Sequence, residues 1–141
     1  MGAVILTLIF GGAYQGKLAY ALERFEISDS EVYRCDDETT VIPAGNRVVY
    51  ELDNWVLALT KAGIDTEEAV KGFIAENKDA VVICNDISCG VVPADPLLRK
   101  WREAVGRALS EIAGQSDEVV RLFCGIPTII KIRNSEFGIR N

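Results

Sequence analysis

The feature that most constrains the fold is an apolar run that ends in a glycine-rich turn and leads directly into a helix-forming segment. Ala3–Phe10 is hydrophobic on both faces, which is typical of an interior strand of a parallel sheet. The turn Gly11–Leu18 has the sequence GGAYQGKL, and Lys17–Arg24 then carries apolar side chains at helical spacing. This order predicts an α/β protein whose glycine turn lies at the carboxyl end of a buried strand.

Strands and helices continue to alternate after this unit, which predicts a sandwich around a mainly parallel sheet. The chain has 141 residues, 49% of them hydrophobic, and no linker-like stretch, so we expect a single domain over residues 1–141. The expected strands are Glu31–Cys35, Arg47–Leu52, Ala80–Asn85, Glu118–Cys124 and Thr128–Ile132, and the expected helices are Asn54–Ala62, a segment capped by Asp65, and a segment that begins with Asp95 and Pro96 and ends at Gly114.

Charge and hydropathy narrow the classes of partner. The net charge of −6 disfavours a surface that neutralises many phosphates, so no nucleic-acid partner is expected. The longest apolar run is much shorter than the ~20 residues of a membrane span, and no Lys or Arg precedes it as in a signal peptide. The scattered cysteines predict reduced thiols in the cytoplasm, and a zinc site at Cys84 and Cys89 is disfavoured because the chain has neither a C-x-x-C motif nor a histidine.

The glycine turn matches the phosphate-loop pattern G-x-x-x-x-G-K-[ST] except at the last position, where Leu18 stands. In such loops backbone N–H groups surround phosphate oxygens, the lysine contacts the β- and γ-phosphates, and the hydroxyl binds Mg²⁺. Lys17 supplies the charge, whereas the side chain of Leu18 cannot bind a metal. The alternative interpretation is a glycine turn with an incidental lysine. The candidate nucleotide-binding residues are Gly11, Gly12, Ala13, Tyr14, Gln15, Gly16, Lys17 and Leu18, together with Asn85 and Asp86.

Acidic residues follow the expected strand Arg47–Leu52. In nucleotide-binding sheets an acid at the end of the strand beside the phosphate loop holds Mg²⁺ through water, and Glu51 or Asp53 is placed for this. We assign Glu51 to metal binding and, with Lys17, to catalysis. Strand-end acids are also common in turns, so this signal is weak by itself. Asn85 and Asp86 end another apolar strand at the sheet edge where α/β proteins bind ligands.

These motifs, in this order, resemble the adenosylcobinamide kinase / adenosylcobinamide-phosphate guanylyltransferase family. Val81–Lys131 contains NDISCGVVP, RKWREAVGR and SDEVVRLFCGIP, where the family has N-E-V-G-x-G-I-V-P, R-x-F/W-R-x-x-x-G-R, and A-D-E-V with a closing G-I/L-P turn. Near the amino end, the glycine turn is similar to the family's G-G-A-R-S-G-K-S loop, and VVYELDNWVLAL to its acidic strand end and helix. The resemblance implies a P-loop NTPase-like three-layer sandwich with a mainly parallel central sheet, GTP or ATP and Mg²⁺ as cofactors, cobinamide as a corrinoid substrate, and a homo-oligomer, a trimer first and a dimer second.

The departures from the family bear on activity. The family phosphorylates the aminopropanol group of cobinamide and then transfers GMP that is carried on a histidine, but this chain has no histidine. Guanylyl transfer by that route is therefore excluded, since no other side chain offers an imidazole. Tyr14, Gln15 and Asp86 replace the family's Arg, Ser and Glu, and the segment between Cys35 and Arg47 is short.

Three functions remain open from the sequence. The first is a nucleotide-binding relative in cobalamin biosynthesis with weak or absent kinase activity. The second is a non-catalytic regulatory or partner-binding relative, a pseudoenzyme, and the third is a structural remnant that binds nothing. The short segment after Cys35 also predicts apolar surface at Val41, Ile42 and Trp55 that needs cover, unless Trp55 packs in the core of its own helix.

Overall fold

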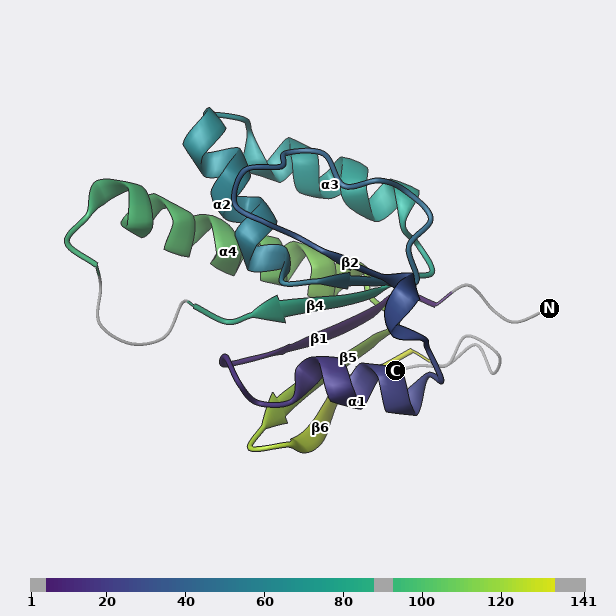
Figure 1. Cartoon of the computed structure of the whole chain (residues 1–141). Helices are drawn as coiled ribbons and strands as arrows, with labels where there is room; N and C mark the ends of the chain where they lie inside the picture. Colours follow the sequence, from purple (N-terminus) through teal and green to yellow (C-terminus); the bar gives the residue numbers. More distant parts are fainter. Residues whose placement is uncertain (1–4, 88–92, 134–141) are drawn as a thin grey trace.

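A computed structural model of the chain describes residues 5–87 and 93–133, and strands and helices alternate through most of them (Figure 1). A single 3₁₀ turn, Asp29–Glu31, precedes the second strand. The elements in chain order are β1 (Thr7–Gly11), α1 (Lys17–Arg24), β2 (Val32–Arg34), β3 (Val48–Tyr50), α2 (Leu52–Ala62), α3 (Thr66–Glu76), β4 (Val81–Asn85), α4 (Pro96–Gln115), β5 (Glu118–Phe123) and β6 (Ile126–Ile132).

The six strands form one sheet in the order β2-β3-β4-β1-β5-β6. Every neighbouring pair is parallel except β5 and β6, which form an antiparallel hairpin. β1 lies inside the sheet, where Thr7 is paired with Val81 of β4 on one side and with Glu118 of β5 on the other. The expected interior parallel strand is therefore confirmed from Thr7 to Phe10, whereas Ile5 and Leu6 precede β1 and Ala3 and Val4 lie outside the described residues.

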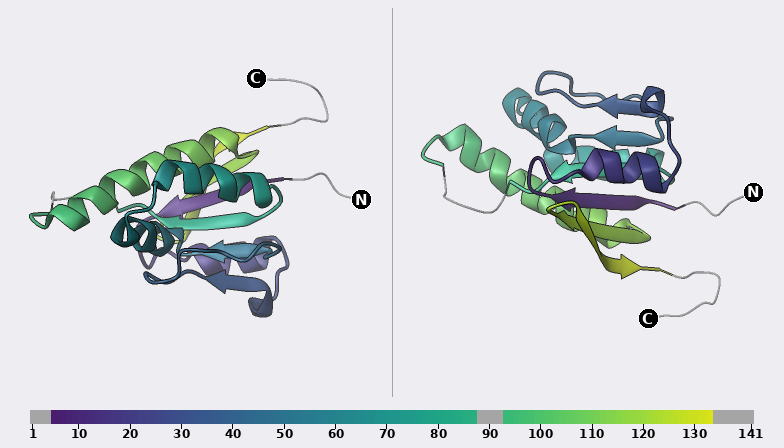
Figure 2. Two further views of the ribbon diagram at one scale, coloured as in Figure 1. Left: turned by 90° about the horizontal axis from the view of Figure 1, so that it is seen from above. Right: turned by 60° about the horizontal axis from the view of Figure 1, so that its bottom comes forward.

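Helices cover both faces of the sheet and make three layers. Helix α1 lies on one face, and α2, α3 and α4 lie on the other, as two further views confirm (Figures 1 and 2). Alternate residues of the strands enter two separate cores, because successive side chains of a strand point to opposite faces. Leu8, Val49, Val82 and Val119 pack with α2, α3 and α4, whereas Ile9, Val48, Ile83 and Val120 pack with α1.

Local hydrogen bonds explain where the helices begin and end. The Asp65 carboxylate accepts from the backbone N–H groups of the first turn of α3, and the Asp95 carboxylate does the same for α4, as expected for helix caps. Helix α4 continues past Gly114, where it was expected to stop, and ends at Gln115; the next residue, Ser116, is its C-cap and has an extended backbone. The Ser116 hydroxyl donates to the carbonyl of Ile112 at 2.6 Å, so the end of the helix is fixed by this bond and not by the glycine.

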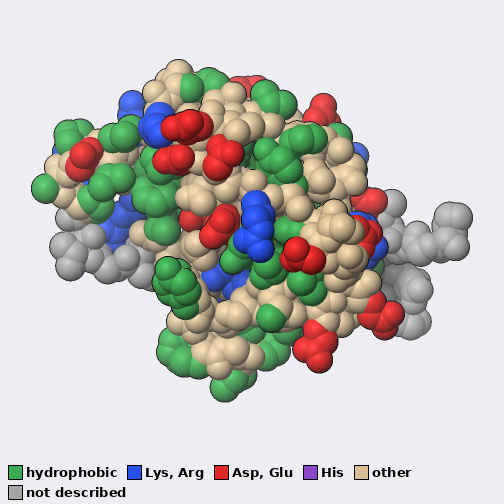
Figure 3. Space-filling view, viewed as in Figure 1, with side chains coloured by type: hydrophobic (Ala, Val, Ile, Leu, Met, Phe, Trp, Pro, Cys, Tyr) green, Lys and Arg blue, Asp and Glu red, His purple; other side chains and the backbone are tan. Residues whose placement is uncertain are grey.

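The exposed apolar surface lies only in part where the sequence placed it. Trp55 is buried and donates its indole N–H to the Thr40 carbonyl at 2.8 Å, so its place is the core. Ile42 packs against the same core, and Val41 is exposed. In Figure 3 hydrophobic side chains gather over the β5–β6 hairpin at the lower edge of the molecule. The exposed large apolar residues of this hairpin are Phe123, Ile126, Ile129, Ile130 and Ile132.

Within residues 5–87 and 93–133, no helix is both long enough and apolar enough to cross a membrane.

Candidate functional site

The glycine turn joins β1 to α1 at the carboxyl edge of the sheet. Gly11 has a φ of 152°, and a Cβ at this position would lie 2.4 Å from the carbonyl oxygen of Leu122 in β5. A side chain at Gly11 would therefore push β1 and β5 apart. Gly16, with a φ of 85°, is the N-cap of α1, and its carbonyl accepts from Tyr20 at 3.0 Å. These two glycines allow the chain to reverse tightly between strand and helix.

Lys17 is the first residue of α1, and its side chain is buried, with 5% of its surface exposed. Its ammonium group donates to the carbonyl of Gly12, so it is turned back toward the loop. Burial lowers the pKa of Lys17 below its ordinary value, and the charge of Asp53 opposes this effect more than Cys84 or Glu51 does. The loop therefore holds a buried cation whose burial cost is only partly offset by the nearby acidic groups.

Asp53 lies in the first turn of α2 and connects three elements of the site. Its side chain is buried, and its carboxylate accepts from Asn85 twice, from the backbone N–H at 3.0 Å and from the side-chain amide at 3.3 Å. Its backbone carbonyl accepts from the indole of Trp101 in α4 at 2.8 Å. Asp53 therefore fixes the start of α2 against the end of β4 and against α4.

Glu51 lies between β3 and α2, in the left-handed conformation with a φ of 62°. It is half-buried, whereas Asp53 is buried and hydrogen-bonded to Asn85. The structure thus brings both acids near Lys17, and the charge of Asp53 raises the pKa of that lysine more than the charge of Glu51 does. The metal-binding and catalytic roles assigned to Glu51 remain predictions.

Asn85 and Asp86 follow the buried part of β4 at the same edge of the sheet. The backbone N–H of Asp86 donates to the carbonyl of Gly11 at 2.8 Å, so the ends of β1 and β4 are held side by side. The Asn85 amide is engaged with Asp53. The rest of the sequence motif that begins here, residues 88–92, lies outside the described residues.

Leu18 is half-buried and packs against the core on the α1 face of the sheet. The buried residues of this core include Ala21, Ile83 and Leu122. A serine or threonine at this position would face the loop in the phosphate-loop pattern, but the leucine contributes to the core in its place. The departure from the pattern at this residue is therefore structurally accommodated.

The β5–β6 turn is a part of the site that sequence reasoning missed. Gln15 accepts from the backbone N–H of Cys124 through its side-chain oxygen and from that of Gly125, at 3.2 Å, through its carbonyl. Cys124 was expected in a strand, but it occupies the turn with a φ of 53°. Tyr14, next to Gln15, also has a positive φ, and its side chain is fully exposed.

The cysteines of the described residues are free thiols. Burial raises the pKa of Cys35 to about 12 and raises that of Cys84 as well, so neither is a thiolate at neutral pH. Cys124 is exposed. Cys89, the second residue of the disfavoured zinc pair, lies outside the described residues.

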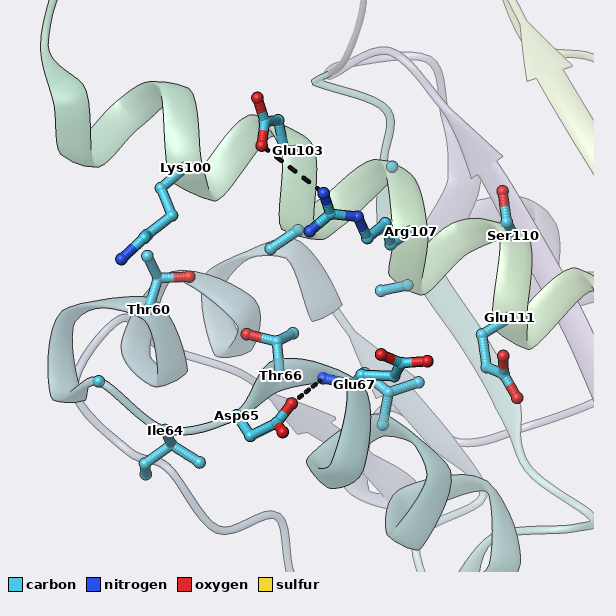
Figure 4. Close-up of a pocket in the computed structure, with 15 residues that line it drawn as sticks. Thr60, Ile64, Asp65, Thr66, Glu67, Lys100, Glu103, Arg107, Ser110 and Glu111 are labelled. Carbon is cyan, nitrogen blue, oxygen red and sulfur yellow. Dashed lines mark hydrogen bonds and ion pairs between the residues drawn. The ribbon is translucent and has the colours of Figure 1, made fainter.

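A groove of about 890 Å³ lies between α4 and the turn that joins α2 to α3 (Figure 4). None of the expected site residues lines it. Some of its charged side chains have partners nearby in the sequence: Arg107 pairs with Glu103 at 3.8 Å, and Asp65 caps α3. The groove is therefore separate from the candidate phosphate site.

A mainly parallel sheet whose inner strand leads through a glycine loop to a buried lysine at the start of a helix defines an α/β protein of the P-loop NTPase-like class. The family model described as cobinamide kinase / cobinamide phosphate guanyltransferase matches residues 43–130, more than half of the chain. The chain belongs to this family, which confirms the resemblance seen in its motifs. The matched region includes Glu51, Asp53 and Asn85 but not the glycine loop.

Two other comparisons were made. A comparison with curated proteins gives no match. Among solved structures, the flagellar accessory protein FlaH from Methanocaldococcus jannaschii is similar in arrangement, with a TM-score of 0.45 and 12% sequence identity over 92% of this chain and 79% of that chain.

Proposed function

We propose that the protein binds GTP or ATP through the loop Gly11–Lys17, as a relative of cobinamide kinase in cobalamin biosynthesis with weak or absent kinase activity. The observation that carries this proposal is the buried ammonium group of Lys17, which faces the loop at the carboxyl edge of a parallel sheet. Backbone N–H groups and one buried cation can bind phosphates without a basic surface, which fits the acidic composition. A cytoplasmic location and the lack of a nucleic-acid partner remain predictions.

In a kinase reaction the γ-phosphoryl group would leave the nucleoside diphosphate oxygen and form a new bond to an acceptor hydroxyl, which loses its proton. Lys17 would hold the β- and γ-phosphate oxygens and offset their charge as the bond breaks. Mg²⁺ in such sites takes one or two carboxylates, water and phosphate oxygens. Glu51 fits this requirement, whereas Leu18 contributes no ligand, so the ion would depend more strongly on the nucleotide.

A non-catalytic, regulatory relative is the second candidate function, and two contacts favour it. Leu18 packs in the core where a metal-binding hydroxyl is expected, and the Asp53 carboxylate already accepts two hydrogen bonds from Asn85. Without a histidine, the chain also lacks the group on which the family carries GMP. A protein with these features can retain phosphate binding while phosphoryl transfer is slow.

The two candidates and the remnant that binds nothing are separated by a ligand screen. The melting temperature is measured with GTP, ATP, GDP and cobinamide, each with and without Mg²⁺, and turnover is measured for the ligands that bind. We expect a nucleotide to raise the melting temperature, because a ligand that binds only the folded state stabilises it. Binding without turnover would favour the regulatory relative, and the absence of any shift would contradict the proposal.

Leu18→Ser is expected to restore part of a Mg²⁺ dependence of nucleotide binding, because it returns the missing hydroxyl to the start of α1. The change also removes apolar packing, at a cost of about 1–3 kcal/mol in the free energy of unfolding. Leu22→Ser is the matched control, since Leu22 packs against the same core from the same helix. If calorimetry shows no more Mg²⁺ dependence in folded Leu18→Ser than in the control, the defect lies elsewhere.

We also expect a homo-oligomer with the phosphate loop near the subunit boundary. The trimer is the preferred prediction and the dimer is the second. The apolar side chains exposed on the β5–β6 hairpin support this expectation, because large exposed apolar patches commonly mark interfaces. The turn of this hairpin is hydrogen-bonded to Gln15 of the phosphate loop, so a subunit interface at the hairpin would lie near the phosphate site. Light scattering at micromolar concentration measures the mass, and a value close to 15.4 kDa would reject the oligomer.

A further inference from the structure

We infer that Gln15 is a positioning residue, which holds the phosphate loop in its binding shape by attaching it to the β5–β6 turn. The inference rests on the proposed function, because it concerns the same loop. The right-hand view of Figure 2 shows the tip of the β5–β6 hairpin against the loop at the end of β1. Two hydrogen bonds, both accepted by Gln15, connect them.

The geometry of the hairpin turn explains why it offers two donors. Phe123 pairs with Ile126, so Cys124 and Gly125 form a two-residue turn, and their φ values of 53° and 75° are those of a type I′ turn. The two central residues of such a turn lie outside the strand ladder, so their N–H groups can donate to partners outside the hairpin. Gln15 supplies both partners, one from its side chain and one from its backbone.

These bonds attach the loop between its two fixed ends, at the residue before the second. At one end the Gly11 carbonyl accepts from Asp86 at 2.8 Å, and at the other the Gly16 carbonyl accepts from Tyr20 at 3.0 Å. Between them the backbone contains Tyr14, whose φ of 61° is unfavourable for a residue with a side chain. The attachment through Gln15 therefore holds a strained stretch in place.

The direction of the Gln15 carbonyl also matters for an anion. Because this carbonyl accepts from Gly125, its oxygen is directed toward the hairpin. A carbonyl oxygen that instead faced the loop interior would repel phosphate oxygens. Holding this peptide in one orientation before the ligand arrives lowers the ordering cost of binding.

The test removes the side-chain acceptor and keeps the size of the side chain. In Gln15→Met we expect GDP to bind about tenfold more weakly by calorimetry, which corresponds to the upper end of the net contribution of one hydrogen bond. Amide hydrogen exchange at Cys124 should become faster in the ligand-free variant, while the melting temperature stays close to that of the wild type. Gln15→Glu keeps an acceptor oxygen and should restore slow exchange at Cys124.

Each outcome bears on the inference. Unchanged exchange at Cys124 in Gln15→Met would overturn the attachment, and unchanged GDP affinity with faster exchange would overturn the positioning role. If the wild type binds no nucleotide, the proposed function fails and the positioning role fails with it, whereas the exchange at Cys124 still reports whether the attachment exists. A similar loss of affinity in Gln115→Met, which makes the same substitution at the exposed last residue of α4, would also contradict a role specific to Gln15.

Discussion

Lys17→Ala is expected to abolish nucleotide binding and to leave the protein folded. The variant removes the buried ammonium group that faces the loop, and the N–H groups that remain bind phosphates without a full charge. It also removes a buried charge, and burying that charge costs free energy. The free energy of unfolding should therefore fall by no more than the packing contacts of the lysine side chain contribute. Calorimetry with GDP measures the binding, and the melting temperature measures the fold.

The control for this variant is Lys71→Ala, which removes an exposed lysine of α3 whose partner is Glu67 at 3.7 Å. GDP affinity should not change in the control, and equal affinity in Lys17→Ala and the wild type would contradict the proposal. The pH dependence gives a second measurement. Because burial lowers the pKa of Lys17, wild-type affinity should fall as the pH rises through a value below the ordinary 10.5, and this fall should be absent from Lys17→Ala.

Gly11→Ala is expected to lower the free energy of unfolding by about 2–3 kcal/mol, through backbone strain and the displacement of β5. The added Cβ would lie 2.4 Å from the Leu122 carbonyl oxygen, and the φ of 152° is unfavourable for alanine. Denaturant unfolding measures the loss, and GDP affinity should fall as well because the loop begins at this residue.

Gly114→Ala provides the matched control for this change. Gly114 lies in α4 with no atom within 4 Å of an added Cβ, so alanine there should stabilise the protein by about 0.5–1 kcal/mol. Opposite effects from the same substitution would show that the position, and not the loss of a glycine, determines the result. A Gly11→Ala variant as stable as the wild type would show that β1 and β5 can separate at no cost.

Features that depend on neighbouring residues were predictable from the sequence. The bounds of α1 agree with the expected Lys17–Arg24, because the glycine turn and the apolar spacing are local signals. The caps at Asp65 and Asp95 are also confirmed, for the same reason. The mainly parallel three-layer arrangement followed from the alternation of strands and helices.

Contacts between distant segments were not predictable in the same way. The sequence gives no direct sign that Gln15 meets the turn at Cys124 and Gly125, because this contact depends on the order of strands in the sheet. The choice between Glu51 and Asp53 likewise depends on where α2 begins, and α2 begins at Leu52, two residues before the expected start. The burial of Trp55 also became clear only from the structure. A helix face that packs in the core and one that contacts a partner protein have the same apolar pattern in the sequence.

The position of β1 between β4 and β5 has a consequence for the order of folding. Although β1 comes early in the chain, its two neighbours come from the middle and from near the carboxyl end, and the Leu6 N–H donates to the Asp117 carboxylate at 2.9 Å. Pairings across such long stretches must overcome a large loop-closure entropy, which slows folding. The glycine loop is therefore synthesised before β5, and we expect it to reach its final geometry only after β5 has been synthesised and has paired with β1.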